Sequence, residues 1–281
     1  MQLVAIDYQA PNAQEAFVKS LHDTGFGVLK NHPIPQQLVE DIYKNWHEFF
    51  NRDNEVKHQY LYNKDKQDGF FPQSVSEVAK GFVKKDIKEY FHFYPWGQCP
   101  PELREQLADY YQQANNLASE LLQWVEDYTP ADIAKNYRQS LSSMIDDSQQ
   151  TLLRVLHYPP LSGEEEPDAI RAAAHEDINR LTVLPAANEP GLQVKLKSGE
   201  WLDVPCDFGT LIVNIGDMLQ EASGHYFPST THRVVNPAGM DTTKARISLP
   251  LFLHPKPEVE LSERYTADSY LKERLQELGV V

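Results

Sequence analysis

Short apolar runs follow one another after about residue 150, and they limit what this chain can fold into more than any other feature. Segments that contain Pro, Gly, Asn or Asp separate each run from the next. The runs lie at 152–158, 181–184, 192–196, 211–215 and 247–253. Short strands divided by turn-forming residues are typical of an antiparallel β-sandwich or barrel. We therefore expect a mainly β core in the second half of the chain.

The first 150 residues instead alternate short strands with helices. Asn12 and Glu15 have the spacing of a capping box and predict that a helix starts there. Pro35 predicts a second start, because proline is favoured in the first helical turn. The expected strands are 3–6 and 25–29, and the expected helices follow Asn12, follow Pro35, and cover 103–125 and 265–278.

The chain has 281 residues and 41% hydrophobic content, which is enough for one large core. β-rich folds with helical additions often exceed about 250 residues as one unit. We expect one compact unit overall, with flanking helices around the β core. Its segments are an N-terminal α/β region (1–100), a scaffold helix with its connection (101–150), the β core (151–255) and a C-terminal helix (256–281).

Charge and composition disfavour several classes of partner. The chain has 26 Lys and Arg against 41 Asp and Glu, a net charge of −15, whereas nucleic acids and anionic membranes select basic surfaces. We therefore expect a small-molecule partner, no nucleic acid and no membrane. No apolar run approaches the roughly 18 residues of a membrane span, and no secretory signal is visible. Two cysteines, Cys99 and Cys206, fit a reducing compartment, so the expected location is cytoplasmic, while the oligomeric state stays open.

His175 and Asp177 are the first candidates for chemistry. On an extended strand, residues i and i+2 emerge from the same face, so this imidazole and this carboxylate could share one metal ion. On a helix they would lie about 200° apart and could not chelate together. The surrounding segment 168–180 would pass as a helix on propensity alone, because it is rich in alanine and charged residues. The metal interpretation therefore predicts extended backbone against local propensity.

His232 can supply a third ligand. Two histidines and one carboxylate form a facial triad, which binds one side of an octahedral iron and leaves three positions open. The ordinary alternative is a surface pair, the commoner role of a histidine beside acidic residues. Arg246 and Ser248 repeat the i, i+2 spacing and would present a guanidinium and a hydroxyl together, which suits a carboxylate. The alternative here is an exposed arginine on an edge strand.

Further motifs accompany these residues in order along nearly the whole chain. They are Ile6-Asp7, the segment 21–32 (LHDTGFGVLKNH), Gly69-Phe70-Phe71-Pro72, the segment 86–91 (DIKEYF), Tyr158-Pro159-Pro160, the segment 216–234 and Arg246-x-Ser248. In this order they resemble the iron- and 2-oxoglutarate-dependent dioxygenases of the isopenicillin N synthase-like family. The resemblance implies a double-stranded β-helix, or jelly-roll, core with a helical N-terminal region packed around it.

The same resemblance implies an Fe(II) site and a 2-oxoglutarate site. The iron ligands would be His175, Asp177 and His232, and the 2-oxoglutarate contacts would be Arg246, Ser248 and Tyr158. With O2, such an enzyme would convert 2-oxoglutarate to succinate and CO2 while it hydroxylates, desaturates or cyclises a small molecule. Leu156 departs from the family pattern, because plant members often carry an asparagine there. This and other departures leave the substrate class open.

The resemblance also suggests which residues surround the iron and contact the substrate. Family members line the substrate side with residues from the N-terminal region and mid-chain loops, although core packing is an alternative for every aromatic ring there. The candidate substrate contacts are Phe71, Phe91 and Phe93. The lysines that could steer an anionic substrate, or belong to a solvated face, are Lys84, Lys85 and Lys88. The expected apolar shell includes Leu156, Val213 and Leu249.

Two other functions stay open on the sequence. An iron oxidase with the same triad could use Arg246 and Ser248 to hold a substrate carboxylate, and would need no 2-oxoglutarate, as with the family's namesake. A non-catalytic jelly roll could bind a metal or a small molecule without turnover. Succinate formation separates the oxidase from the oxygenase, and the intact set of ligands argues against the non-catalytic alternative.

Overall fold

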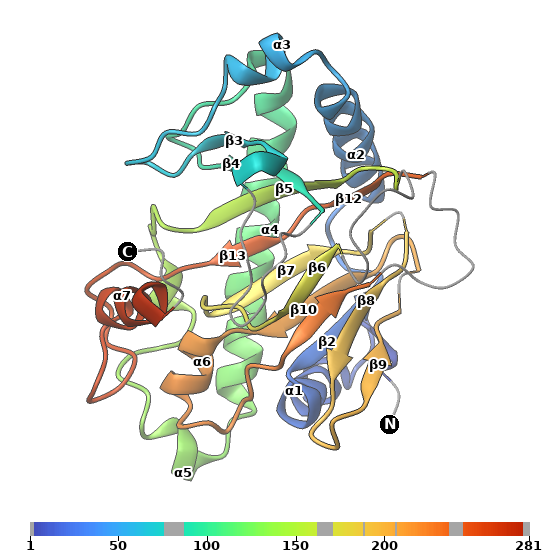
Figure 1. Ribbon diagram of the computed structural model, residues 1–281. Helices are drawn as coiled ribbons and strands as arrows, with labels where there is room; N and C mark the ends of the chain where they lie inside the picture. Colours follow the sequence, from blue (N-terminus) through green and yellow to red (C-terminus); the bar gives the residue numbers. More distant parts are fainter. Residues whose placement is uncertain are drawn as a thin grey trace.

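The computed structural model describes residues 3–75, 87–161, 171–187, 189–205, 207–235 and 244–277. In these ranges two β-sheets face each other, and long helices cover the outer side of the larger sheet (Figure 1). This is the jelly-roll core with flanking helices that the resemblance implies, so the fold class is confirmed.

The larger sheet joins strands from both halves of the chain. Its order is β1-β2-β10-β7-β13-β5-β4-β3, and β12 also pairs with β5. The strands are β1 (Ala5–Asp7), β2 (Phe26–Lys30), β3 (Gly69–Phe71), β4 (Glu89–Phe93), β5 (Leu152–Tyr158), β7 (Leu181–Pro185), β10 (Leu211–Ile215), β12 (Arg246–Ser248) and β13 (Leu251–Leu253). These strands pair antiparallel except β1 with β2. Strands from the N-terminal region thus complete the sheet at both of its edges.

The smaller sheet has the order β6-β11-β8-β9. Its strands are β6 (Ala172–His175), β8 (Leu192–Lys195), β9 (Trp201–Asp203) and β11 (His232–Val234). Side chains from β6, β8 and β11 line a pocket together with side chains from the larger sheet. The pocket therefore lies between the two sheets.

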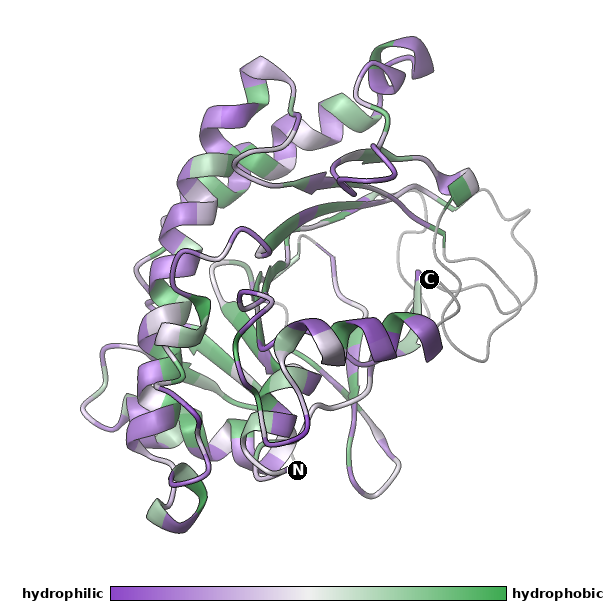
Figure 2. Cartoon of the chain, turned by 90° about the vertical axis from the view of Figure 1, so that its left-hand side faces the viewer, coloured by the Kyte–Doolittle hydropathy of each residue, from purple (hydrophilic) through white to green (hydrophobic). Residues whose placement is uncertain are grey.

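The three longest of the described helices pack on the outer side of the larger sheet. The described helices are α1 (Ala13–Thr24), α2 (Gln36–Phe50), α3 (Asn54–His58), α4 (Pro101–Asp127), α5 (Ala131–Ala134), α6 (Asp217–Ala222) and α7 (Ala267–Glu277), with short 3₁₀ turns at Gln73–Val75 and Ser143–Ile145. One face of α4 is buried along its length, including Leu107, Tyr110 and Leu121. Figure 2 shows hydrophobic strands next to these helices and mostly hydrophilic outer helix surfaces. None of the helices in the described ranges is long and apolar enough to cross a membrane.

The two faces of the larger sheet differ because side chains alternate along each strand. On β5, Leu153 and Val155 belong to the main hydrophobic core, which the helices cover. The alternate residues of the same strand, Arg154, Leu156 and Tyr158, face the smaller sheet and line the pocket. The other strands of this sheet divide their side chains between the two sides in the same way.

Most elements expected from the sequence are confirmed, and three expectations need correction or completion. The run at 247–253 is two strands, β12 and β13, rather than one; Pro250 lies between them and has no N–H for the ladder. Asn12 is the N-cap of α1, but its side chain makes no capping hydrogen bond, so the capping box is wrong. The strands β3, β4, β9 and β11 were not predicted from the sequence.

The described part of the segment 168–180 has the extended backbone that the metal interpretation predicts, although its composition favours a helix. β6 ends at His175, and the backbone is non-helical from there through Asp177. Within the described part of this segment, which begins at Arg171, no helix forms before Leu181. Pairing with β11 overrides the helical preference of the alanines.

Candidate active site

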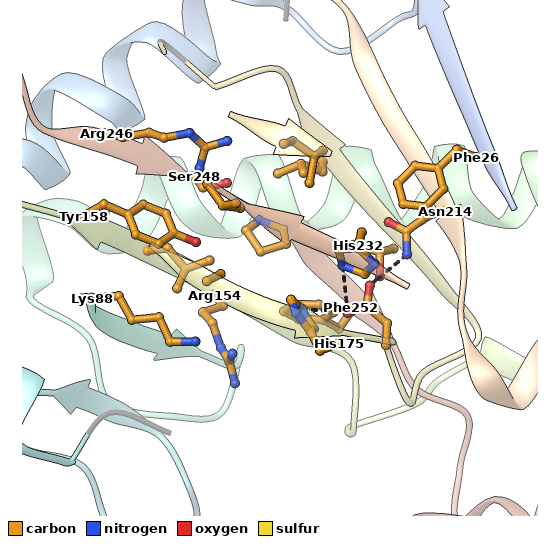
Figure 3. A pocket seen from close by; sticks show the side chains of 18 residues that line it. Phe26, Lys88, Arg154, Tyr158, His175, Asn214, His232, Arg246, Ser248 and Phe252 are labelled. Atoms are coloured by element: carbon orange, nitrogen blue, oxygen red, sulfur yellow. Dashed lines mark hydrogen bonds and ion pairs between the residues drawn. The ribbon is translucent and has the colours of Figure 1, made fainter. Parts of the chain in front are cut away.

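A pocket between the sheets collects most of the candidate residues (Figure 3). The empty space among its lining residues is about 590 Å³, open solvent at the mouth included. Histidines and a carboxylate lie at one end, and an arginine, a serine and a tyrosine lie toward the other.

Strand pairing places the two histidines next to each other. His175 is the last residue of β6, His232 is the first residue of β11, and the two are pairing partners. Their rings lie 4.4 Å apart, centroid to centroid. Positions far apart in the chain thus meet because the small sheet pairs the end of one strand with the start of another.

Asp177 completes the group from the loop that follows β6. Its Oδ1 lies 3.9 Å from His175 Nε2 and 3.7 Å from His232 Nε2. One ligand atom from each residue lies within 4.8 Å of the others. This spacing allows all three atoms to contact one ion at their centre.

Hydrogen bonds orient the aspartate. Thr182 Oγ1 donates to Asp177 Oδ2 over 2.6 Å, and Asn214 Nδ2 donates to the same oxygen over 2.8 Å. Oδ2 is thereby fixed in the fold while Oδ1 faces the imidazoles. Burial raises the pKa of Asp177, but the two histidines and these two hydrogen bonds outweigh it, so that its pKa is lower than usual. The carboxylate is ionised, as a metal ligand must be.

Backbone carbonyls orient the imidazoles. His175 Nδ1 lies 2.7 Å from the carbonyl of Ala173, and His232 Nδ1 lies 3.1 Å from the carbonyl of Thr230. Because a carbonyl only accepts, each Nδ1 carries a proton, and Nε2 is the ring nitrogen that faces Asp177 Oδ1. Burial lowers the pKa of His175 to about 4, with a further contribution from His232, so His175 is neutral at physiological pH. These donor atoms fit a divalent transition metal such as iron(II).

Arg246, Ser248 and Tyr158 form a second group on the larger sheet. β12 pairs with β5 so that Arg246 lies opposite Tyr158 and Ser248 opposite Leu156. All four side chains line the pocket. Arg246 is buried, its Nε donates to the carbonyl of Glu189 over 3.0 Å, and its guanidinium carbon lies 5.3 Å from the centre of the Tyr158 ring. A buried, oriented guanidinium beside a hydroxyl is suited to a carboxylate.

Several pocket residues were missed by reasoning from the sequence. Thr182 and Asn214 hold Asp177, and Arg154 and Phe252 line the pocket wall. A usable signal existed for the first two, because each is a single polar residue inside an apolar strand. Such a residue at a buried position needs a hydrogen-bonding partner, which here is the aspartate.

Other candidates lie away from the pocket. Phe91 and Phe93 are fully buried in the core beneath the helices, and Phe71 stacks on Tyr90 and Tyr62 without lining the pocket. Of the expected apolar shell, Leu156 lines the pocket, but Val213 and Leu249 face the helices, so their assignment to the shell is wrong. Lys88 lines the pocket, whereas Lys84 and Lys85 lie outside the described residues.

Comparison with known proteins agrees with this arrangement. Residues 149–255 match the 2OG-Fe(II) oxygenase superfamily, and residues 4–118 match the N-terminal region described as non-haem dioxygenase in morphine synthesis. The chain is 30% identical over 275 residues to oxoglutarate-dependent flavonoid 7-O-demethylase 1 of Ocimum basilicum, covering 92% of this chain and 70% of that one.

The chain is also 28% identical over 257 residues to 2-oxoglutarate-dependent dioxygenase 11 of Oryza sativa subsp. japonica, covering 85% of this chain. It spans only 65% of that relative's length. A crystal structure described as that of an oxygenase from Shewanella oneidensis is 62% identical, with a TM-score of 0.92 and 100% of both chains covered.

Proposed function

The chain belongs to the 2OG-Fe(II) oxygenase superfamily, the non-haem iron(II) enzymes that use 2-oxoglutarate as co-substrate, and from that premise we propose the reaction and the roles of its pocket residues. The protein oxidises a small molecule with O2 by hydroxylation, desaturation or cyclisation. The observation that carries this proposal is the placement of Asp177 Oδ1 within 3.9 Å and 3.7 Å of two imidazole Nε2 atoms.

His175, Asp177 and His232 are the proposed iron ligands. When bound, iron(II) and 2-oxoglutarate supply the activation of O2, with succinate and CO2 as the products of the co-substrate. The chain's part is to present Nε2 of each imidazole to the metal, to hold the carboxylate ionised, and to leave one side of the metal open. Thr182 and Asn214 support this geometry by fixing the other oxygen of Asp177.

Arg246 and Ser248 are the proposed contacts of the distal carboxylate of 2-oxoglutarate, with Tyr158 beside them. The bond from Arg246 Nε to the carbonyl of Glu189 sets the guanidinium plane before any ligand binds. An oriented guanidinium loses less conformational entropy on binding than a mobile one. Leu156, in place of an asparagine, contributes an apolar wall and no hydrogen bond to the co-substrate.

Succinate release tests this proposal. Protein loaded with Fe(II) without oxygen, and then started with O2, should release succinate only when 2-oxoglutarate is present. The His232→Ala variant should lose iron binding and succinate release, because two remaining ligands rarely hold a divalent ion. His58→Ala, an exposed histidine on α3, is the matched control and should retain both. If oxygen is consumed with a substrate but no succinate forms, the protein is an iron oxidase that does not use 2-oxoglutarate, and the proposed oxygenase function is wrong.

We also propose that the segments 1–100, 101–150, 151–255 and 256–281 form one unit in a cytoplasmic protein. Pairing of β2 with β10 and of β4 with β5 supports the single unit, because N-terminal strands complete the core sheet. A single cooperative unfolding transition checks it. The buried free thiol of Cys99 fits a reducing compartment, and cell fractionation tests that location.

A further inference from the structure

Two cations line the pocket outside the groups assigned so far. Arg154 lies on β5, four residues before Tyr158 and on the same face, and Lys88 immediately precedes β4. Lys88 is only 6% exposed. Figure 3 shows both side chains on one wall of the pocket, below Tyr158 and away from Arg246. They are thus positioned to contact a molecule between the metal ligands and this wall.

Neighbouring side chains hold Arg154 in one orientation. Its Nε donates to His92 Nε2 over 2.9 Å, and His92 Nδ1 in turn lies 2.8 Å from the carbonyl of Gln67. The carbonyl can only accept, so His92 carries its proton on Nδ1 and accepts from Arg154 at Nε2. The guanidinium carbon also lies 4.7 Å from the ring centre of Tyr90 and 5.4 Å from that of Phe252. A guanidinium held in this way is ordered before it binds an anion.

The charges of the pocket favour an anionic substrate. Asp177 is the only acidic residue among the described residues that line it, and Arg246 balances that charge. Iron(II) and the two carboxylates of 2-oxoglutarate balance each other as well. Lys88 and Arg154 add two positive charges to this neutral set. Both also make further interactions in the fold, so the argument depends on their charge and position and not on vacant hydrogen bonds.

We propose that the primary substrate is a small carboxylic acid, and that Arg154 and Lys88 bind its carboxylate and so direct the rest of the molecule toward the metal. This inference rests on the proposed function, since it takes the opposite wall of the pocket to hold 2-oxoglutarate. The planar fork of Arg154 matches a carboxylate, and the ammonium of Lys88 adds a second charge-assisted donor.

A panel of small carboxylic acids, each paired with its own primary amide, tests the proposal. The readouts are the rate of succinate release above the substrate-free rate, and the change in the visible absorption of the iron–2-oxoglutarate complex when a compound binds. Acids should increase succinate release, while their amides should not. In Arg154→Gln the half-saturating concentration of an active acid should rise about 10-fold or more, because a charge-assisted hydrogen bond is lost. Arg154→Lys should recover part of the affinity.

Two further variants separate binding from folding. Arg264→Gln removes an exposed arginine that lies over Tyr265, remote from the pocket, and should leave the acid response unchanged. Lys88→Gln should weaken acid binding as well. If thermal unfolding shows that Arg154→Gln does not fold, the acid affinity of Lys88→Gln tests the anion site in its place. The preference for acid over amide is informative, because a general structural defect would weaken both compounds alike.

The outcomes are distinguishable. The anion site is overturned if succinate is released but acids and amides act equally, if no acid in the panel has an effect, or if a folded Arg154→Gln keeps the wild-type half-saturating concentration. If no protein in the set releases succinate from 2-oxoglutarate, the proposed function fails and this inference fails with it.

Discussion

The two faces of the larger sheet are built from the same strands but have different tasks. Toward the helices, the strands present residues such as Leu153, Val155 and Phe91, which are fully buried in the main core. Toward the smaller sheet, the alternate positions of β5 present Arg154 and Tyr158, which line the pocket. One residue along a strand therefore separates a residue that stabilises the fold from one that is available for chemistry.

This difference explains why the aromatic residues expected to contact the substrate do not line the pocket. Phe91 and Phe93 were candidates because members of the resembled family line the substrate side with residues from the N-terminal region and mid-chain loops. Their parity places them beneath the helices, where the ring centre of Phe91 lies 4.9 Å from that of Trp46 on α2 and the ring centre of Phe93 lies 6.2 Å from that of Tyr111 on α4. The pocket face of the same strand carries Tyr90 instead. Proximity in sequence to a site is thus a weaker guide than the face of the strand.

The largest expected effect on stability comes from the helix-facing side. Phe91→Ala should lower the free energy of unfolding by about 3–5 kcal/mol, because it removes a fully buried ring from a packed aromatic cluster. Phe252→Ala, a half-buried aromatic on the pocket side, is the matched variant and should cost only about 1–2 kcal/mol. Urea denaturation of both measures the difference, and equal losses would contradict the division between the faces.

The pocket-facing side should show the opposite pattern. Arg246→Leu should weaken 2-oxoglutarate binding by at least about 30-fold, roughly 2 kcal/mol, because a buried carboxylate would lose its charged partner. Iron affinity should change little, since the metal ligands belong to other strands. Titration of the iron-loaded protein with 2-oxoglutarate measures the effect, with Arg264→Leu as the exposed control. Wild-type affinity in Arg246→Leu would remove this residue from the co-substrate site.

A smaller effect on iron affinity is expected from a residue that orients a metal ligand. Thr182→Val keeps the shape of the side chain but removes the hydroxyl that donates to Asp177 Oδ2. Iron affinity should fall about 10-fold, because groups that orient a metal ligand typically contribute this much. Thr210→Val, in which the lost hydroxyl bonds to the carbonyl of Asp207, is the control. Competition with a chelator of known affinity measures both, and identical results would show that the hydroxyl does not support the metal.

The sequence predicts the core of the fold and the candidate site for a physical reason. Strand period, turn residues and the i, i+2 spacing of His175 with Asp177 are local properties, and all of them can be read without knowing which strands pair. The position of β11 beside β6 is not local, because the ladder that joins them depends on the whole sheet. The face on which Phe91 lies depends on the register of β4 against β5, which places Phe91 opposite Val155. Such register information is absent from a single sequence.

The pairing of His175 with His232 has a consequence for the integrity of the smaller sheet. An ion held by both residues is a cross-link that closes the intervening stretch of chain into a loop, and it forms only when the two strands are in register. Its binding free energy therefore adds to the stability of that register. Loss of iron would then destabilise the pairing of β6 with β11 as well as stop turnover. The local stability of the smaller sheet would therefore depend on the supply of metal.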